Sequence, residues 1–517
     1  HRTNHHAATY VCDYCLRPCC SEDVLGRHLV YCSRHPPQQV YYPNPADPKQ
    51  CTLKFRETYK QFYLPFYLVA DFEAFLSPTT GGTSRIVDEH VPSGFCVYRI
   101  SDIPEYQSVP FVYSGPEVMS HFYDHIMSES QTISEILDMD CYMLPLTEEE
   151  QVRYDATDFC PYRDCKFDPA TNPKVRHHHH STGRFISAAC NNCNLQLKLI
   201  KSNLKKPRTN DDKDEYDEED ATERYVTGYF LPIVFHNLKG YDAHFVIKHF
   251  QRKYAEEVNP KTGEVIVNDV KVIPLNSQKY LMFEVGRLRF LDSFQFLSTS
   301  LSSLTDMLLK SGKENFVHTV RHFKTDDPLL FAKGVYPYSY MDSREKFAET
   351  ELPSRDKFYN ALTEECLSEE DYERAQATWK RFGIENMEQY HNFYLTLDVL
   401  LLTDVYEYFR RTMYAKHNLD CLHYYTLPQL SWSAALRYTK AEIDLLTDGD
   451  AYLMIESSMR GGISQISCRF AEANNKEVEG YDPQVETSHV TYLDANNLYG
   501  HAMSEPLPLS DFRFLTP

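Results

Sequence analysis

The sequence lacks any uninterrupted apolar run that approaches the roughly 18 residues of a membrane-spanning helix. No secretory signal pattern stands at its start either, and we expect no membrane partner. Because the chain begins with His1 rather than Met, we interpret it as a fragment, which leaves open a targeting segment ahead of it.

Basic residues are outnumbered: 53 lysines and arginines stand against 74 aspartates and glutamates, for a formal charge of -21. This balance argues against broad, sequence-independent adhesion to nucleic acid. It leaves room for a nucleic-acid enzyme, because metal sites are themselves acidic and the run Asp211–Asp220 carries much of the excess charge. We expect that run to be a solvated loop.

An even spread of cysteines, as a disulfide framework would need, is also missing, because the cysteines are clustered along the sequence. This clustering favours Zn2+ over disulfides and indicates an intracellular, reducing compartment. The 517 residues suffice for two or three domains with a sizeable core. Eight of the fifteen cysteines fall in four tight pairs: Cys12 with Cys15, Cys19 with Cys20, Cys160 with Cys165, and Cys190 with Cys193.

The first 35 residues have the spacing of a small ββα zinc finger. Cys12 and Cys15 form a knuckle, and twelve residues later His28 and Cys32 stand one helical turn apart. His35 is the alternative fourth ligand. The predicted helix over 21–28 is acidic with a single arginine, so a structural or protein-docking finger is as well supported as one that reads DNA.

A second metal-type pattern lies inside the main globular region. Residues 36–53 are rich in proline and predict a stiff linker, after which we expect a domain over 54–415. Within it, the insert over 158–200 carries two cysteine pairs that predict a four-thiolate zinc site. Its ligands are Cys160, Cys165, Cys190 and Cys193.

The stretch over 66–75 is apolar except for two carboxylates, Asp71 and Glu73. On a strand, the period of two places both carboxylates on one face and the apolar side chains from Leu68 to Ala74 on the other. Two carboxylates side by side favour a bound cation. An edge strand with a solvated acidic face is the alternative.

Later segments add further acids. A strand over 229–235 is followed by a helix from 243 to 250, with Asp242 at the junction, where α/β domains expose functional groups. A hairpin over 280–291 follows. On the helical stripe over 387–411, Tyr394 and Asp398 are four residues apart and share a face. The run over 490–494 predicts a last buried strand that ends in Asp494.

In this order, Asp71-x-Glu73, Asn237-x4-Asp242 and Tyr394-x3-Asp398 resemble the three exonuclease motifs of family B DNA polymerases. More narrowly, Phe-His-Asn-Leu-Lys-Gly-Tyr-Asp at 235–242 and Tyr-Leu-Asp-Ala-Asn-Asn-Leu-Tyr-Gly at 492–500 look like the protein-primed branch. That branch is found in Polinton- or Maverick-type mobile elements and related viruses. The resemblance runs from about residue 66 to the end.

The resemblance implies an α/β (α+β) fold with a ribonuclease H-like domain that has metal-dependent 3′-5′ exonuclease activity on single-stranded primer ends. Tyr394 would orient the attacking water. Asn237, Ser300 and Leu301 fall where the family contacts the single-stranded primer end. Two Mg2+ or Mn2+ ions would be held by Asp71, Glu73, Asp242 and Asp398.

Residues 486–517 resemble the start of a polymerase palm, joined to the exonuclease domain by a connecting region over 416–485. Asp494 matches the first polymerase-site aspartate, and Tyr499 matches the residue that stacks under the sugar and rejects a 2′-hydroxyl. The family's later aspartate and fingers lysine do not occur before Pro517, so we expect no nucleotide incorporation by this polypeptide. A DNA-touching linking segment, or a simple turn, is predicted at Arg460, Gly461 and Gly462.

The 158–200 insert also resembles the endonuclease VII type of HNH module, in which cysteine pairs bind structural zinc. By that resemblance His178 would be the general base and Asn194 a metal ligand. His177 takes the place of the metal-binding aspartate, which suits Mg2+ poorly, so we favour a structural zinc insert over an active nuclease.

We therefore interpret the chain as part of a protein-primed family B DNA polymerase, a nucleotidyltransferase of DNA replication. The implied partners are single-stranded and primer–template DNA, a dNTP in the full-length protein, and a priming protein. The implied location is the nucleus or a viral or mobile-element replication site. The alternatives are an HNH-type endonuclease and a non-catalytic, zinc-dependent nucleic-acid- or protein-binding remnant of a mobile element.

Overall fold

The computed structural model describes residues 10–15, 17–34, 37, 41–78, 88–139, 141–197, 230–258, 265–267, 270–275, 279–360, 364–459, 461 and 465–514. The predicted acidic loop over 211–220 lies outside these ranges. Two compact units make up the chain, one of His1–Phe55 with Thr439–Pro517 and one of Arg56–Tyr438. Within the described ranges, no helix has both the length and the apolar character needed to span a bilayer.

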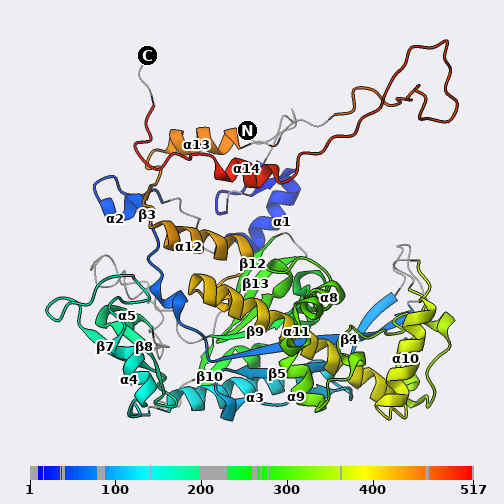
Figure 1. The fold of residues 1–517 in the computed structure, drawn as a ribbon, viewed down its shortest axis with the longest axis horizontal. Helices are drawn as coiled ribbons and strands as arrows, with labels where there is room; N and C mark the ends of the chain where they lie inside the picture. The colour runs from blue at the N-terminus through cyan, green and yellow to red at the C-terminus, as the bar shows by residue number, and fades with distance from the viewer. Residues whose placement is uncertain are drawn as a thin grey trace. The chain divides into compact units, whose positions relative to one another are not determined.

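A seven-stranded mixed sheet forms the centre of the Arg56–Tyr438 unit (Figure 1). Its three central strands, β14, β9 and β4, run parallel, and the other neighbours are antiparallel. The predicted strands over 66–75 and 229–235 and the predicted hairpin over 280–291 are confirmed. In spatial order the strands are β12 (Val270–Pro274), β13 (Tyr280–Val285), β14 (Leu288–Asp292), β9 (Leu231–Phe235), β4 (Phe66–Pro78), β5 (Asp88–Ser101) and β6 (Phe111–Tyr113).

Alternation along β4 separates a core face from a polar face, as the period of a strand requires. Phe72 and its apolar neighbours lie in the main core, which α3 (Val118–Asp138) and α7 (Asp242–Lys248) complete. The ring of Phe72 is 4.6 Å from that of Phe122 in α3, centroid to centroid. On the other face lies α11 (Met387–His417) (Figure 1). Its Glu407 accepts a hydrogen bond from the Tyr67 hydroxyl of β4.

Helix α11 is the longest element of the described ranges, and its 31 residues extend for about 46 Å. The Asn386 side chain caps the N-terminus of this helix and accepts a hydrogen bond from the backbone amide of Gln389 at 2.9 Å. The apolar stripe from Leu397 to Val405 packs against α8 (Leu301–Ser311) and the segment that leads to α9 (Val317–Phe323). Helix α11 thus presents residues to strands β4, β5 and β6 of the sheet.

The remaining elements of this unit are smaller. The insert forms the antiparallel hairpin of β7 and β8, followed directly by α5, and this arrangement brings its cysteines together. The bounds are α4 (Glu148–Asp155), β7 (Lys174–His178), β8 (Phe185–Cys190), α5 (Asn191–Gln196), β10 (Glu256–Val258), β11 (Val265–Val267), α10 (Glu369–Arg381) and α12 (Leu427–Thr439).

In the other unit, the sequence before Arg56 and the sequence after Tyr438 share a small sheet. Strand β3 (Thr52–Leu53) pairs with β15 (Ile443–Asp444), and the amide of Asp444 donates to the carbonyl of Leu509 at 2.8 Å. The hairpin of β1 (Tyr10–Val11) and β2 (Pro18–Cys19) precedes α1 (Glu22–Cys32). The short helices are α2 (Pro48–Cys51), α13 (Gly449–Ser458) and α14 (Leu498–Ser504).

The prediction of a buried strand over 490–494 is wrong. These residues form no strand, and Val490 and Tyr492 are 63% and 89% exposed. A strand needs a neighbour to pair its backbone N–H and C=O groups. None of the strands in the described part of this unit pairs with the segment, so its apolar sequence alone does not make it a strand.

Candidate functional site

Four carboxylates from three elements gather on the polar face of β4. Asp71 and Glu73 come from that strand, Asp242 is the first residue of α7, and Asp398 lies in α11. Asp71 is half-buried, whereas the other three are at most 7% exposed. Opposite Glu73, β5 has Gly94, where a Cβ would lie 2.6 Å from His391 of α11, so strand and helix approach closely.

The negative charges of these acids raise one another's pKa values. Burial, and then the charge of Asp398, raises the pKa of Asp71 to about 7. Burial, followed by the charges of Asp71 and Asp398, holds the pKa of Glu73 well above its ordinary value. Burial and the charge of Asp71 have the same effect on the pKa of Asp242. Mutual repulsion of this kind is relieved by a cation.

Lys333 supplies a positive charge that sequence reasoning did not identify. Its ammonium Nζ lies 2.8 Å from Asp398 Oδ2, and Asp398 raises the pKa of Lys333 although burial lowers it. The sequence offered one weak signal, a lysine directly before Gly334 in a loop that ends in Pro337. Nothing in the loop's spacing relates it to Asp398, 65 residues later, so only the fold brings the two together.

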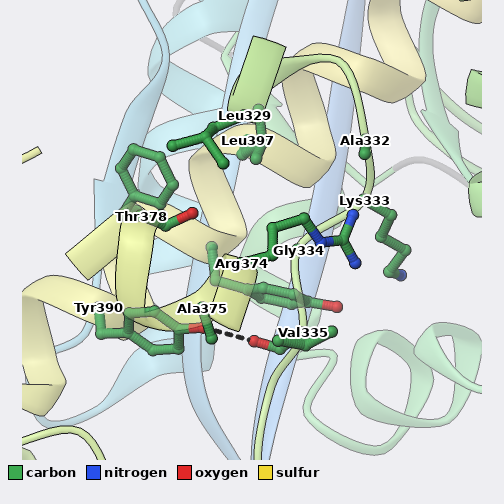
Figure 2. A pocket seen from close by; sticks show the side chains of 12 residues that line it. Leu329, Ala332, Lys333, Gly334, Val335, Arg374, Ala375, Thr378, Tyr390 and Leu397 are labelled. Carbon is green, nitrogen blue, oxygen red and sulfur yellow. Dashed lines mark hydrogen bonds between the residues drawn. The ribbon is translucent and has the colours of Figure 1, made fainter. Parts of the chain in front are cut away.

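Tyr394 stands beside these acids with its hydroxyl 2.7 Å from that of Tyr338. Burial, followed by the charge of Asp398, raises its pKa well above the ordinary value, so the phenol stays protonated. Tyr394 also lines a cavity of about 20 Å3, room for one water molecule, together with the residues labelled in Figure 2. The Lys333–Gly334–Val335 segment forms one wall, and a Cβ on Gly334 would lie 2.8 Å from the Tyr394 ring.

The donor set fits Mg2+ or Mn2+, which prefer carboxylate oxygens. Asp242 Oδ1 and Asp398 Oδ1 are buried and have no hydrogen-bond partner among the described residues, which leaves each oxygen available to a cation. The acids are spread wider than a closed metal cage. Among the described residues, groups of three or more ligand atoms that lie within 4.8 Å of one another occur only in two sets that contain cysteines.

A second polar segment borders the parallel strand ends. Asp292, at the end of β14, accepts the backbone amides of Asn237 at 2.9 Å and Lys239 at 3.3 Å. His236 is within hydrogen-bond distance of the Thr299 carbonyl at 3.0 Å, next to Ser300. Ser300 caps α8, and Leu301 begins that helix as a buried residue. The fold therefore brings the Asn237 and Ser300 segments together, with Asp292 as a fixing residue that the sequence did not reveal.

Among the described residues, each of the two units contains a group of closely spaced cysteines. In the first, Cys15 Sγ is 3.2 Å from His28 Nε2, and the ligand atoms of Cys12 and Cys32 complete the group. His35 lies outside the described residues. In the second group, the sulfurs of Cys160, Cys190 and Cys193 lie within 4.8 Å of one another.

Cys165 belongs to the same loop, but its sulfur lies outside that closely spaced set and accepts from Asn172 at 3.1 Å. The insert's other predicted residues are also paired locally. Asn194 Oδ1 lies 2.9 Å from His177 Nδ1, and the ring of His178 is 4.9 Å from that of His180, centroid to centroid. His178 therefore does not share the buried position of His177 beside Asn194.

The residues predicted for a polymerase site are exposed where the structure describes them. Asp494 is exposed in an irregular segment, and Tyr499 is 89% exposed in α14. Gly461 is exposed and has open space around it. Arg460 and Gly462 lie outside the described residues.

Comparison with known proteins identifies a family. The model for "DNA polymerase type B, organellar and viral" matches residues 231–516, more than half of the chain. That range contains Asp242, Tyr394, Asp398 and Asp494. Asp71, which lies in β4, precedes the matched range. Neither the curated proteins nor the solved structures gave a match. The chain therefore belongs to the type B DNA polymerases of the organellar and viral family.

Proposed function

We propose that the Arg56–Tyr438 unit is a metal-dependent 3′-5′ exonuclease that trims single-stranded primer ends for a protein-primed type B DNA polymerase. The convergence of four carboxylates, two of them with an unpaired buried oxygen, carries the proposal. The strand order β6-β5-β4-β9-β14, with β5 antiparallel to three parallel strands, supports a ribonuclease H-like domain. The motifs at 235–242 and 492–500 support the protein-primed, mobile-element or viral branch.

The chemistry follows from the roles of the side chains. Asp71, Glu73, Asp242 and Asp398 would hold two divalent cations, which supply an activated water and charge stabilisation at the leaving oxygen. Tyr394 keeps its proton and so orients the water as a hydrogen-bond partner. Lys333 forms an ion pair with the Asp398 carboxylate. For the primer end, Asn237 and Ser300 present polar groups beside the site, without a pattern that reads base sequence.

The two cysteine groups are proposed as structural zinc sites. Sulfur and imidazole ligands select Zn2+ over Mg2+, and the insert's sulfurs accept backbone amides, with Cys190 N–H to Cys160 Sγ and Cys193 N–H to Cys190 Sγ both at 3.4 Å. In the insert, Cys165 is the proposed fourth ligand from the same loop. We also propose that Asp494 and Tyr499 belong to the family's polymerase site.

The exonuclease proposal is tested with a 5′-labelled single-stranded oligonucleotide in Mg2+ or Mn2+. We expect stepwise loss of 3′ nucleotides by the native chain. The double change Asp71→Ala with Glu73→Ala should reduce the rate by at least about 100-fold, because it removes half of the oxygen ligands. The matched control, Glu370→Ala with Glu373→Ala on the exposed face of α10, should retain the native rate.

A closed circular duplex serves as the second substrate. An exonuclease needs a 3′ end and leaves the circle intact, whereas an endonuclease in the insert would nick it and lose that activity on His178→Ala. Trimming that survives the Asp71 and Glu73 changes would show that the carboxylates are assigned wrongly.

A further inference from the structure

A polar cavity of about 180 Å3 lies in the Arg56–Tyr438 unit, between the end of β5, helix α9 and the last third of α11. We call it the arginine cavity, after Arg321, Arg410 and Arg411 in its lining. It is separate from the carboxylate site. Arg410 follows Asp398 by twelve residues, which is about 18 Å along the helix. On the sheet, Ser101 pairs with Phe66, five residues or about 17 Å from Asp71.

His318 lines this cavity with one ring nitrogen paired and the other unpaired. The Tyr98 hydroxyl lies 3.0 Å from His318 Nδ1. Burial lowers the pKa of His318 to about 4, which keeps the ring neutral. His318 is 3% exposed, and its Nε2 has no partner among the described residues.

The arginines of the lining differ in their ion pairs. Arg410 is held by Asp420 and Glu407, and Arg411 also pairs with Glu407, so one carboxylate serves both neighbours. Within the described ranges no carboxylate forms an ion pair with Arg321. Asp102, at the exposed rim, is the other acid of the lining.

We propose that the arginine cavity binds a phosphate group, carried either by a mononucleotide or by a strand of DNA. The unpaired, buried Nε2 of His318 and the exposed guanidinium of Arg321 favour an anionic ligand with several oxygens. The cavity volume of about 180 Å3 has room for one phosphate with the start of its sugar. In a chain of formal charge -21, three arginines that line one cavity favour such a ligand.

The test is isothermal titration calorimetry of the native chain without added divalent cations, so that the carboxylate site holds no metal and no oligonucleotide is degraded. The probes are thymidine 5′-monophosphate, thymidine, and a twelve-residue oligothymidylate. We expect phosphate-dependent binding, with thymidine inactive. Arg321→Gln should weaken it at least fivefold, and Arg321→Lys should restore part of it. Arg163→Gln, an exposed arginine outside the cavity, should leave affinity unchanged.

The two sources give different results. If the monophosphate binds and inorganic phosphate displaces it, the ligand is a mononucleotide. If only the oligothymidylate loses affinity on Arg321→Gln, the ligand is a strand phosphate. Arg411→Gln, at a side chain that is 60% exposed, provides an independent variant should Arg321→Gln fail to fold. Affinities that stay within twofold of native for both Arg321→Gln and Arg411→Gln would overturn the proposal.

Discussion

Asp71 and Glu73 show how a pair of side chains acquires a chemical role from its surroundings. On a strand with one solvated face, both acids would be ionised and mutually harmless. Here α11 covers them, and Asp398 and Asp242 add two more acids to a buried space. Lys333 offsets a single charge. The remaining repulsion predisposes the folded protein to take up either protons or divalent cations.

At this scale the first prediction concerns pH and metal. The Asp71 carboxyl has a pKa of about 7 in the folded chain against 3.8 ordinarily. The folded state therefore binds a proton that the unfolded state lacks between these values, and its stabilising effect is lost as the pH rises through about 7. Asp71→Asn should raise the melting temperature at pH 8 without divalent cations, by about 2–4 °C per kcal/mol of repulsion removed.

The gain should shrink toward pH 5, where the native carboxyl is protonated, and should vanish in Mn2+, which Asp71→Asn binds more weakly. Glu370→Gln on exposed α10 is the control. A melting-temperature difference that does not depend on pH would contradict the argument.

Lys333 carries the second residue-scale prediction. Its removal in Lys333→Ala leaves the buried Asp398 without its ion-pair partner, and we expect the exonuclease rate to fall by about 10- to 100-fold. Lys313→Ala is the control, because its pair with Asp326 is about two-thirds exposed. The rates are compared on single-stranded oligonucleotide, with circular dichroism to confirm folding. Equal rates for the two variants would remove Lys333 from the site.

At the scale of elements, α11 is held at its C-terminal end by a buried ion pair. Arg410 donates to both oxygens of Asp420, at 2.9 and 2.7 Å, and to the Leu64 carbonyl just before β4. Asp420 also accepts the Leu64 amide at 2.8 Å. The end of the helix is thereby fixed to the start of the strand, and Asp398 is held opposite Asp71.

The third prediction follows from this ion pair. Asp420→Ala leaves Arg410 buried without its main counter-charge, and the unfolding free energy should fall by about 3–5 kcal/mol. Asp326→Ala, at an exposed pair, should cost less than about 1 kcal/mol. Urea denaturation measures both. A loss no larger than that of the control would show that α11 is held mainly by its apolar contacts.

Elements with a strong internal pattern were predictable from sequence. The alternation over 66–75 and the helical stripe over 387–411 both became the expected elements. Pairings across long distances were not predictable, because the contact of Lys333 with Asp398 has no local pattern. The segment over 490–494 shows the opposite error, since its composition suits a strand but the described part of the unit provides no partner strand.

At the scale of the whole molecule, each unit contains one cysteine group in its described part, and the group of the Arg56–Tyr438 unit is linked to the main body of that unit. Gln61 donates to the Tyr162 carbonyl at 2.9 Å, and Arg437 donates to the Pro161 carbonyl at the same distance. Both carbonyls directly follow Cys160. A metal that orders this loop therefore also orders the contacts of α12 and of the segment before β4.

The last prediction is that the purified chain contains about two zinc ions. Cys12→Ser with Cys15→Ser, and Cys160→Ser with Cys193→Ser, should each reduce the content by about one, measured by atomic emission. Only the second pair should lower the melting temperature of the Arg56–Tyr438 unit, because only that loop holds Gln61 and Arg437. Cys366→Ser, at an exposed cysteine outside both groups, should change neither quantity. A zinc content that the second pair leaves unchanged would show that the insert's sulfurs are held by packing and hydrogen bonds alone.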